Sequence, residues 1–207
     1  MKYLRIILVG IFSFSTFIFS ANAQQGEVRM TLSLAGATPS GDFKDIVSKT
    51  NFRGADVQIL YGFTDKISAG LNFGFQDFYE KFPRAVYKTT DGSDISAVIT
   101  NSVQVIPFLA TVRYNLLPQA RIQPYASAGL GGAAVLNRQF LGEYPNSDNK
   151  IGFAARPGAG VYIPFRKQGE VGLNLGVNYT HVGYKTDNAS NLGYLGFHIG
   201  IGFPMRD

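Results

Sequence analysis

Residues 170–203 read EVGLNLGVNYTHVGYKTDNASNLGYLGFHIGIGF, and this stretch decides the fold of the chain. Large apolar side chains alternate with glycine or polar ones on both sides of the polar segment 185–191. The apolar series are Val171, Leu173, Leu175, Val177 and Tyr179, then Leu195, Phe197, Ile199, Ile201 and Phe203. An alternation of period two over about ten residues predicts a β-strand. We therefore expect a hairpin of two antiparallel strands here.

The two faces of this hairpin suit a wall between lipid and the interior of a barrel. One face is uniformly bulky and apolar, while the other carries glycine or polar side chains that could not fill an apolar core. Strands of transmembrane barrels turn apolar residues toward lipid and polar residues toward the lumen. The hairpin is therefore predicted to be part of a membrane-spanning barrel.

The same alternation recurs along the chain before the hairpin. The predicted earlier strands are 27–36, 54–63, 67–76, 102–115, 121–137 and 150–163. The connections alternate in length, with long or moderate loops at 39–53, 78–101, 138–149 and 182–191 and short turns at 64–66, 116–120 and 164–169. An even strand count with short turns at one end and longer loops at the other is typical of outer-membrane barrels. The sequence therefore predicts an all-β fold, an eight-stranded antiparallel up-and-down transmembrane β-barrel.

Three prolines fall inside predicted strands. They are Pro107, Pro124 and Pro157. Proline cannot donate a hydrogen bond to a neighbouring strand, and a closed barrel has no free edge for it. We expect each of them to mark a β-bulge or the end of a strand.

Residues 1–23 have the pattern of a cleaved secretory signal peptide. Lys2 and Arg5 precede an apolar run over 6–19, and Ala21-Asn22-Ala23 supplies a cleavage site with small residues. The alternative is an uncleaved anchor, but the apolar run is short for a membrane-spanning helix. We expect residues 24–207 to form the mature outer-membrane β-barrel domain.

The composition excludes several classes of function. The chain has no cysteine, so disulfides and thiolate metal sites cannot form. Its two histidines, His181 and His198, fall on opposite faces of the predicted hairpin, which gives no transition-metal site. Charged residues are spread along the chain, whereas nucleic-acid binding proteins concentrate basic residues on one face. We predict no cofactor, no metal and no nucleic-acid partner.

Inward-facing positions carry charged side chains that would meet inside the barrel. The candidates are Arg29, Asp56, Arg113 and Arg156. An eight-stranded barrel is only wide enough for side chains to fill its interior, and charges enclosed there must be paired. We interpret these residues as a polar network that fills the lumen. The alternative is a gate, in which Asp56 with Arg113 or Arg156 opens a narrow channel.

Several glycine- and proline-containing segments carry a family resemblance. They are residues 35–43 (AGATPSGDF), 123–132 (QPYASAGLGG), 157–161 (PGAGV) and the last strand ending at Phe203. With them the chain resembles the small outer-membrane β-barrel family of Gram-negative bacteria, the OmpA/OmpX/OmpW-like porin-family barrels. The resemblance implies insertion by the barrel-assembly machinery, contact with outer-membrane lipid and lipopolysaccharide, periplasmic termini and extracellular loops whose binding partner is unknown.

Some small barrels are lipid A deacylases, which carry a histidine with a serine two positions later. The resemblance reaches His181, but the serine position is Gly183, and Ser190 lies in the following loop. We therefore predict no catalytic residue and a non-enzymatic protein with a structural or surface-interaction role through its loops. Three alternatives stay open: a narrow channel for small solutes or hydrophobic molecules, a lipid A-modifying enzyme, and a soluble periplasmic barrel that binds an apolar ligand.

Overall fold

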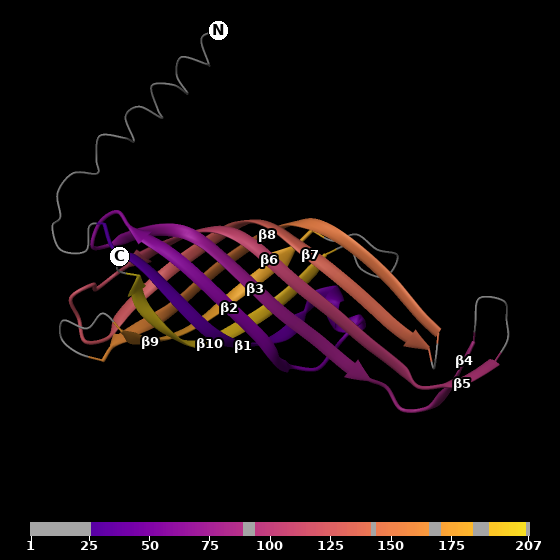
Figure 1. Ribbon diagram of the computed structural model, residues 1–207. Helices are drawn as coiled ribbons and strands as arrows, with labels where there is room; N and C mark the ends of the chain where they lie inside the picture. The colour runs from indigo at the N-terminus through magenta and orange to yellow at the C-terminus, as the bar shows by residue number, and fades with distance from the viewer. Residues whose placement is uncertain (1–25, 89–93, 142–143, 166–170, 184–190, 206–207) are drawn as a thin grey trace, which may run out of the picture.

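The computed structural model is a closed barrel of eight strands, described over residues 26–88, 94–141, 144–165, 171–183 and 191–205 (Figure 1). The barrel strands are β1 Val28–Ser40, β2 Asn51–Gly62, β3 Ile67–Lys81, β6 Ile99–Asn115, β7 Gln123–Leu141, β8 Tyr144–Pro164, β9 Gly172–Val182 and β10 Leu192–Met205. Each pairs in antiparallel fashion with the next barrel strand along the chain, and β1 pairs with β10 to close the barrel. The predicted eight-stranded up-and-down fold is confirmed.

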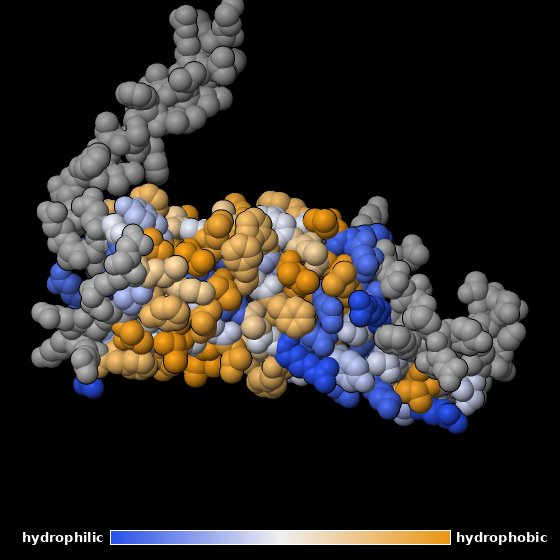
Figure 2. Space-filling model, viewed as in Figure 1, coloured by the Kyte–Doolittle hydropathy of each residue, from blue (hydrophilic) through white to orange (hydrophobic). Residues whose placement is uncertain are grey.

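The two faces of the strands differ as the alternation predicts. On the outer wall Phe73 and Phe108 are 44% and 49% exposed, whereas the inward-facing Asn72 and Arg113 are 4% and 5% exposed. Figure 2 shows a broad apolar band over the strands on the face in view, with hydrophilic residues gathered beside it. The large apolar side chains therefore cover the outside of the barrel rather than its centre.

The connections divide the barrel into two ends. The ends of the barrel domain, Val28 and Met205, lie side by side, together with the turns after β2, β6 and β8 (Figure 1). We call this the terminus end. The opposite end, which we call the loop end, holds the connections after β1, β3, β7 and β9. The connections after β1, β3 and β9 are longer than the turns at the terminus end, as predicted, whereas the connection after β7 spans only residues 142–143.

The predicted loop 138–149 is wrong. Strand β7 continues to Leu141 and β8 begins at Tyr144, and the two pair along this whole region. The polar and proline-containing sequence there resembles a loop because this part of the sheet lies beyond the apolar band and needs no alternation of apolar residues. Pro145 is tolerated because no described residue pairs with the other side of β8 at residues 144–152.

The two other long connections contain structure of their own. The 3₁₀ helix η1, Gly41–Asp45, lies between β1 and β2, where we predicted only a loop. Between β3 and β6 a small hairpin forms from β4, Ala85–Lys88, and β5, Asp94–Ala97. Strands β3 and β6 extend into the predicted loop 78–101 from both ends, which the prediction of a long loop with strand extensions allows. No helix in the described ranges is long and apolar enough to cross a membrane.

The three prolines are accommodated in two ways. Pro124 stands at the second residue of β7, as expected for a strand end. Opposite Pro107 the pairing of β3 with β6 skips two residues, and at Pro157 the pairing of β8 with β9 does the same; both resume in unchanged register. The prediction of a bulge is therefore wrong for Pro107 and Pro157. Each proline lacks one backbone N–H donor, and a local gap in the hydrogen-bond ladder is enough to accommodate it. A register shift occurs instead in the pairing of β1 with β2, between Ala35 and Ala37 of β1.

Candidate functional site

An apolar layer occupies the lumen at the loop end, where the sequence pattern predicts only small and polar side chains. Its buried members are Ala37, Phe43, Val47, Phe78, Val103, Val105, Leu109, Ala133, Val135, Ala154, Val182, Leu192 and Tyr194. Two of them, Phe43 and Val47, come from the connection between β1 and β2 and are fully buried. Segment 41–50, which we call the plug, therefore folds back into the barrel and closes it from the loop end.

The plug is held by aromatic packing and by a buried carboxylate. The rings of Phe43 and Phe78 meet edge to face, with centroids 4.8 Å apart. Glu80, 5% exposed, accepts hydrogen bonds from the backbone N–H of Ser48 at 2.7 Å and from its hydroxyl at 3.1 Å. Lys49 Nζ lies 3.8 Å from the same carboxylate. A carboxylate satisfied by several donors fixes the plug against β3.

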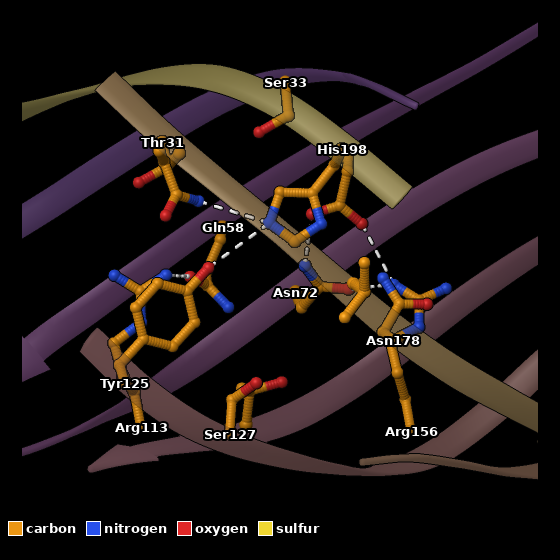
Figure 3. A pocket seen from close by; sticks show the side chains of 14 residues that line it. Thr31, Ser33, Gln58, Asn72, Arg113, Tyr125, Ser127, Arg156, Asn178 and His198 are labelled. Carbon is orange, nitrogen blue, oxygen red and sulfur yellow. Dashed lines mark hydrogen bonds and ion pairs between the residues drawn. The ribbon is translucent and has the colours of Figure 1, made fainter. Parts of the chain in front are cut away.

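Arg156 crosses the lumen directly beneath the apolar layer. Its Nη1 donates to Asp56 Oδ2 at 3.0 Å and to Asn72 Oδ1 at 2.9 Å (Figure 3). Its Nε donates to Thr180 Oγ1 at 2.8 Å and its Nη2 to the Tyr194 hydroxyl at 3.3 Å. Since these partners come from β2, β3, β9 and β10, one guanidinium ties together opposite walls of the barrel.

Asp56 is satisfied on both oxygens. Its Oδ1 accepts a hydrogen bond from Asn72 Nδ2 at 2.6 Å, while Oδ2 receives Arg156. The two side chains of the ion pair are 17% and 13% exposed. A shielded pair of this kind fills the lumen, and the carboxylate needs no further hydrogen-bond donor.

Arg113 forms a second layer closer to the terminus end. Its Nη2 donates to Gln58 Oε1, and its guanidinium carbon lies 4.0 Å from the centre of the Tyr125 ring. The Tyr125 hydroxyl lies 3.3 Å from His198 Nε2, and Asn174 Nδ2 lies 3.4 Å from the same nitrogen. Figure 3 shows these side chains converging from several strands on one space.

Arg29 lies lower still, at the terminus end. Its Nη2 is 3.5 Å from Glu27 Oε2, and its guanidinium carbon lies 4.8 Å from the centre of the Tyr162 ring. Of the four residues predicted to form a lumen network, the structure brings Asp56 and Arg156 into contact, whereas Arg29 and Arg113 have other partners. Their joint role as a functional network stays a prediction.

Sequence reasoning missed several partners inside the lumen. Tyr125 and Tyr194 have inward parity, but a period-two pattern gives no height along the barrel axis. The apolar layer was also missed, although Val103, Val105 and Leu109 have the parity of Arg113. Their odd-numbered positions along β6 are enough to predict that these three side chains face the lumen. Nothing in the pattern indicates that the plug enters the barrel.

The histidine that resembles part of the deacylase pair lies on the outer wall. His181 is exposed next to the end of β9, and Gly183 donates its N–H to Phe153 O at 2.8 Å. Ser190 falls outside the described residues. Within the described ranges no three histidine, aspartate or glutamate side chains come together as metal ligands.

Three small cavities follow one another along the lumen. The first, about 20 Å³, lies between the apolar layer and Arg156 and touches Pro107 and Tyr194. The second, about 30 Å³, lies between Arg156 and Arg113. The third, about 20 Å³, lies beyond Arg113 and is lined by Arg29 and Asn115. Each is large enough for one or two waters, so the two arginines divide the lumen into compartments.

A closed eight-stranded barrel with an apolar outer wall and a lumen filled by side chains defines a small outer-membrane barrel. Comparison with protein families agrees with this class. Residues 7–203 match the model of the outer membrane protein beta-barrel domain, and the chain belongs to that family. No curated protein matches the chain in sequence.

Solved structures share the fold at low sequence identity. Neisserial surface protein A matches with a TM-score of 0.55 and 16% identity, covering 86% of this chain and 96% of that chain. Ail, the attachment invasion locus protein of Yersinia pestis, matches with a TM-score of 0.52 and 13% identity, covering 87% and 99%. A second structure of Ail, in complex with the heparin analogue sucrose octasulfate, matches with a TM-score of 0.51 and 12% identity, again covering 87% and 99%.

Proposed function

We propose that this chain is a non-enzymatic outer-membrane protein that presents a rigid sheet at its loop end for surface interactions. The observation that carries the proposal is the extension of β3, β6, β7 and β8 beyond the apolar band (Figures 1 and 2). Strand β8 pairs with β9 only from Ala154 onward, so its residues 144–153 continue past the barrel wall on that side. Four paired strands make a stiffer platform than a long irregular loop.

The outer face of the extension changes character at one level of the sheet. Phe75, Ile106, Ala134 and Ile151 stand in corresponding positions on the four strands and form the last apolar row. The next outward row holds Asp77, Gln104, Leu136 and Asn149. A change from apolar to polar side chains marks the boundary between lipid and water. Six to seven residues of each strand lie beyond this boundary, and these support a role outside the membrane.

The exposed charge at the loop end favours a polyanionic partner. Among the loop-end residues whose side-chain exposure the structure describes, seven basic ones are exposed: Lys44, Lys49, Arg53, Lys81, Arg84, Arg138 and Lys150. The exposed acidic residues of this set are Asp42 and Asp45. A surface with an excess of one charge attracts ligands of the opposite charge. We therefore propose a sulfated polysaccharide as the partner of this chain, and the complex of Ail with a sulfated heparin analogue supports this choice.

The proposal includes an orientation for the whole chain. Residues 1–23 act as a signal peptide, residues 24–207 form the barrel, and the loop end faces outward with both termini in the periplasm. The barrel-assembly machinery inserts the chain, and outer-membrane lipid and lipopolysaccharide surround its apolar band. Glycine at position 183 supports the absence of deacylase activity, because it has no nucleophile. Intact lipid A acyl chains in cells that express the protein, measured by mass spectrometry, would agree with this assignment.

Neutralising the loop-end charge tests the interaction directly. The double variant Lys81→Gln with Arg138→Gln should bind a heparin-coated surface roughly tenfold more weakly than the wild type, because each exposed charge contributes up to about 1 kcal/mol. The measurement is surface plasmon resonance with the full chain in nanodiscs at fixed ionic strength. The matched control is Lys66→Gln with Arg121→Gln, which removes the same charges at the terminus end. Equal losses in both variants would contradict a loop-end binding surface.

A narrow channel is the second candidate, favoured by the row of cavities along the lumen. The ion pair between Asp56 and Arg156 separates two of them, so it would act as the gate. If so, Asp56→Ala should raise single-channel conductance in planar bilayers above the wild-type level, because Arg156 loses its partner. Conductance that is unchanged or absent in Asp56→Ala would reject the gate and leave the polar network as packing alone.

A further inference from the structure

Among the described lumen residues, one buried arginine has no carboxylate beside it. Arg29 lies 3.5 Å from Glu27, and Arg156 lies 3.0 Å from Asp56. Arg113 is 5% exposed, and no carboxylate of a described residue lies within ion-pairing distance of it. A buried charge requires a counter-charge or a full set of hydrogen-bond partners to offset the loss of hydration. Of the three described lumen arginines, Arg113 is the one without a carboxylate partner, while Arg29 Nε and Asn174 Oδ1 also lack hydrogen-bond partners.

The hydrogen bonding of Arg113 is also incomplete. Its Nη2 donates to the neutral side chain of Gln58, and its guanidinium lies against the ring of Tyr125. Its buried Nε has no hydrogen-bond partner. An arginine side chain offers five N–H donors in a fixed plane, suited to an anion. At least one of these donors is left for a ligand.

A cavity of about 30 Å³ adjoins this guanidinium. Its lining includes the hydroxyl groups of Thr31, Thr111 and Ser127, and Ser127 stands directly across from Arg113 on β7. The carboxylate among its lining residues is Asp56, which already receives Asn72 and Arg156. The cavity therefore combines a guanidinium with hydroxyl donors and contains no uncommitted anionic group of the described residues.

We propose that this cavity binds one small inorganic anion of about the size of chloride, held by Arg113 and the hydroxyl groups around it. The anion enters from the terminus end through the cavity of about 20 Å³ that Arg113 also lines. This site goes beyond the surface interaction proposed above and does not require ions to pass through the barrel.

An anion fits this space better than water alone. Water can accept a hydrogen bond from Nε, but it leaves the positive charge of Arg113 uncompensated. A halide accepts the hydrogen bond and also compensates the charge. The space exceeds the minimum for one water, about 10–15 Å³, yet is too small for a polyatomic anion with a full shell of donors. Chloride and bromide are accordingly the ligands to test.

Anion-dependent stability tests the proposal. The full chain, refolded in nanodiscs, is unfolded by heat in sodium gluconate or in sodium chloride at the same ionic strength. The unfolding temperature should rise saturably with chloride, by about 2–4 °C, because the ligand binds the folded state alone. Crystals grown with bromide should show an anomalous scattering peak next to the Arg113 guanidinium. An unfolding temperature independent of chloride, or no such peak, would overturn the proposal.

Two variants locate the effect. Ser127→Asp supplies a fixed carboxylate opposite Arg113, so it should be stable in gluconate and lose its response to chloride. Arg113→Met should lose the response to chloride because the positive charge is gone. If Arg113→Met does not fold, the result for Ser127→Asp alone tests the site. The control Arg53→Met, whose side chain is 60% exposed on the outer wall, should respond like the wild type. A wild-type chloride response in Ser127→Asp would refute the site.

Discussion

Replacing Arg156 with methionine is expected to lower the free energy of unfolding by about 3–5 kcal/mol, the usual cost of removing one partner of a buried ion pair. The substitution leaves Asp56 in the lumen with Asn72 as its remaining donor. It also removes the hydrogen bonds to Thr180 and Tyr194, which connect β8 to β9 and β10. Urea unfolding of the full chain in phospholipid vesicles, followed by circular dichroism, measures the change.

Two comparisons separate the ion pair from general effects of the substitution. The double variant Asp56→Asn with Arg156→Met removes both charges and should recover a large part of the loss, because no uncompensated charge remains. Arg53→Met breaks a pair with Asp77 on the outer wall, 3.4 Å apart with Arg53 60% exposed. That change should cost at most about 1 kcal/mol. Similar losses for Arg53→Met and Arg156→Met would refute the special role of the lumen pair.

Replacing Phe43 with alanine should free the plug from the barrel. The side chain is fully buried among apolar lumen residues, and removing a buried phenylalanine ring costs about 3–5 kcal/mol. The substitution should lower the free energy of local opening of segment 41–50, since the hydrogen bonds between the barrel strands do not depend on Phe43. Hydrogen exchange at the Val47 amide, which donates to Phe43 O at 3.1 Å, should accelerate by roughly a hundredfold or more.

The control for the plug is a phenylalanine from the same end of the barrel. Phe52 is 75% exposed and meets Phe197 with ring centroids 5.3 Å apart. Phe52→Ala should change exchange at Val47 little, because it leaves no cavity in the lumen. Slow, wild-type exchange in Phe43→Ala would mean that the contacts of Glu80 hold the plug without the apolar anchor.

The strands within the apolar band could be predicted from sequence, and their extensions could not. Alternation marks a strand where one face must be apolar, as in Leu195–Phe203. Beyond the band the outer face carries polar side chains such as Asp77 and Gln104, so the backbone pairing of β7 with β8 over 138–149 leaves no apolar alternation in the sequence. The segment of the β4–β5 hairpin also lacks a sustained alternation, and the sequence alone predicts a loop there.

The candidate site was predicted in part for a similar reason. Parity placed Asp56, Arg113 and Arg156 inside the barrel, since successive residues of a strand face opposite sides. The height of each residue depends on the stagger between strands, which no single strand contains. The contact of Arg156 with Asp56, and the separation of Arg113 from both, therefore required the register of all eight strands.

The pairing of β1 with β10 has a consequence for how the barrel assembles. Thirteen residue pairs join these strands, from Val28 with Met205 to Ser40 with Gly193, so the first strand, which pairs with β2 on one side, finds its second partner in the last strand. Contacts between residues so distant in sequence form slowly, because the loop that they close must first lose its entropy. Until then two rows of backbone donors and acceptors have no partners, which the hydrocarbon interior does not tolerate. Closure of this seam is therefore the step that makes the chain compatible with the membrane, and it waits for the final residues of the domain.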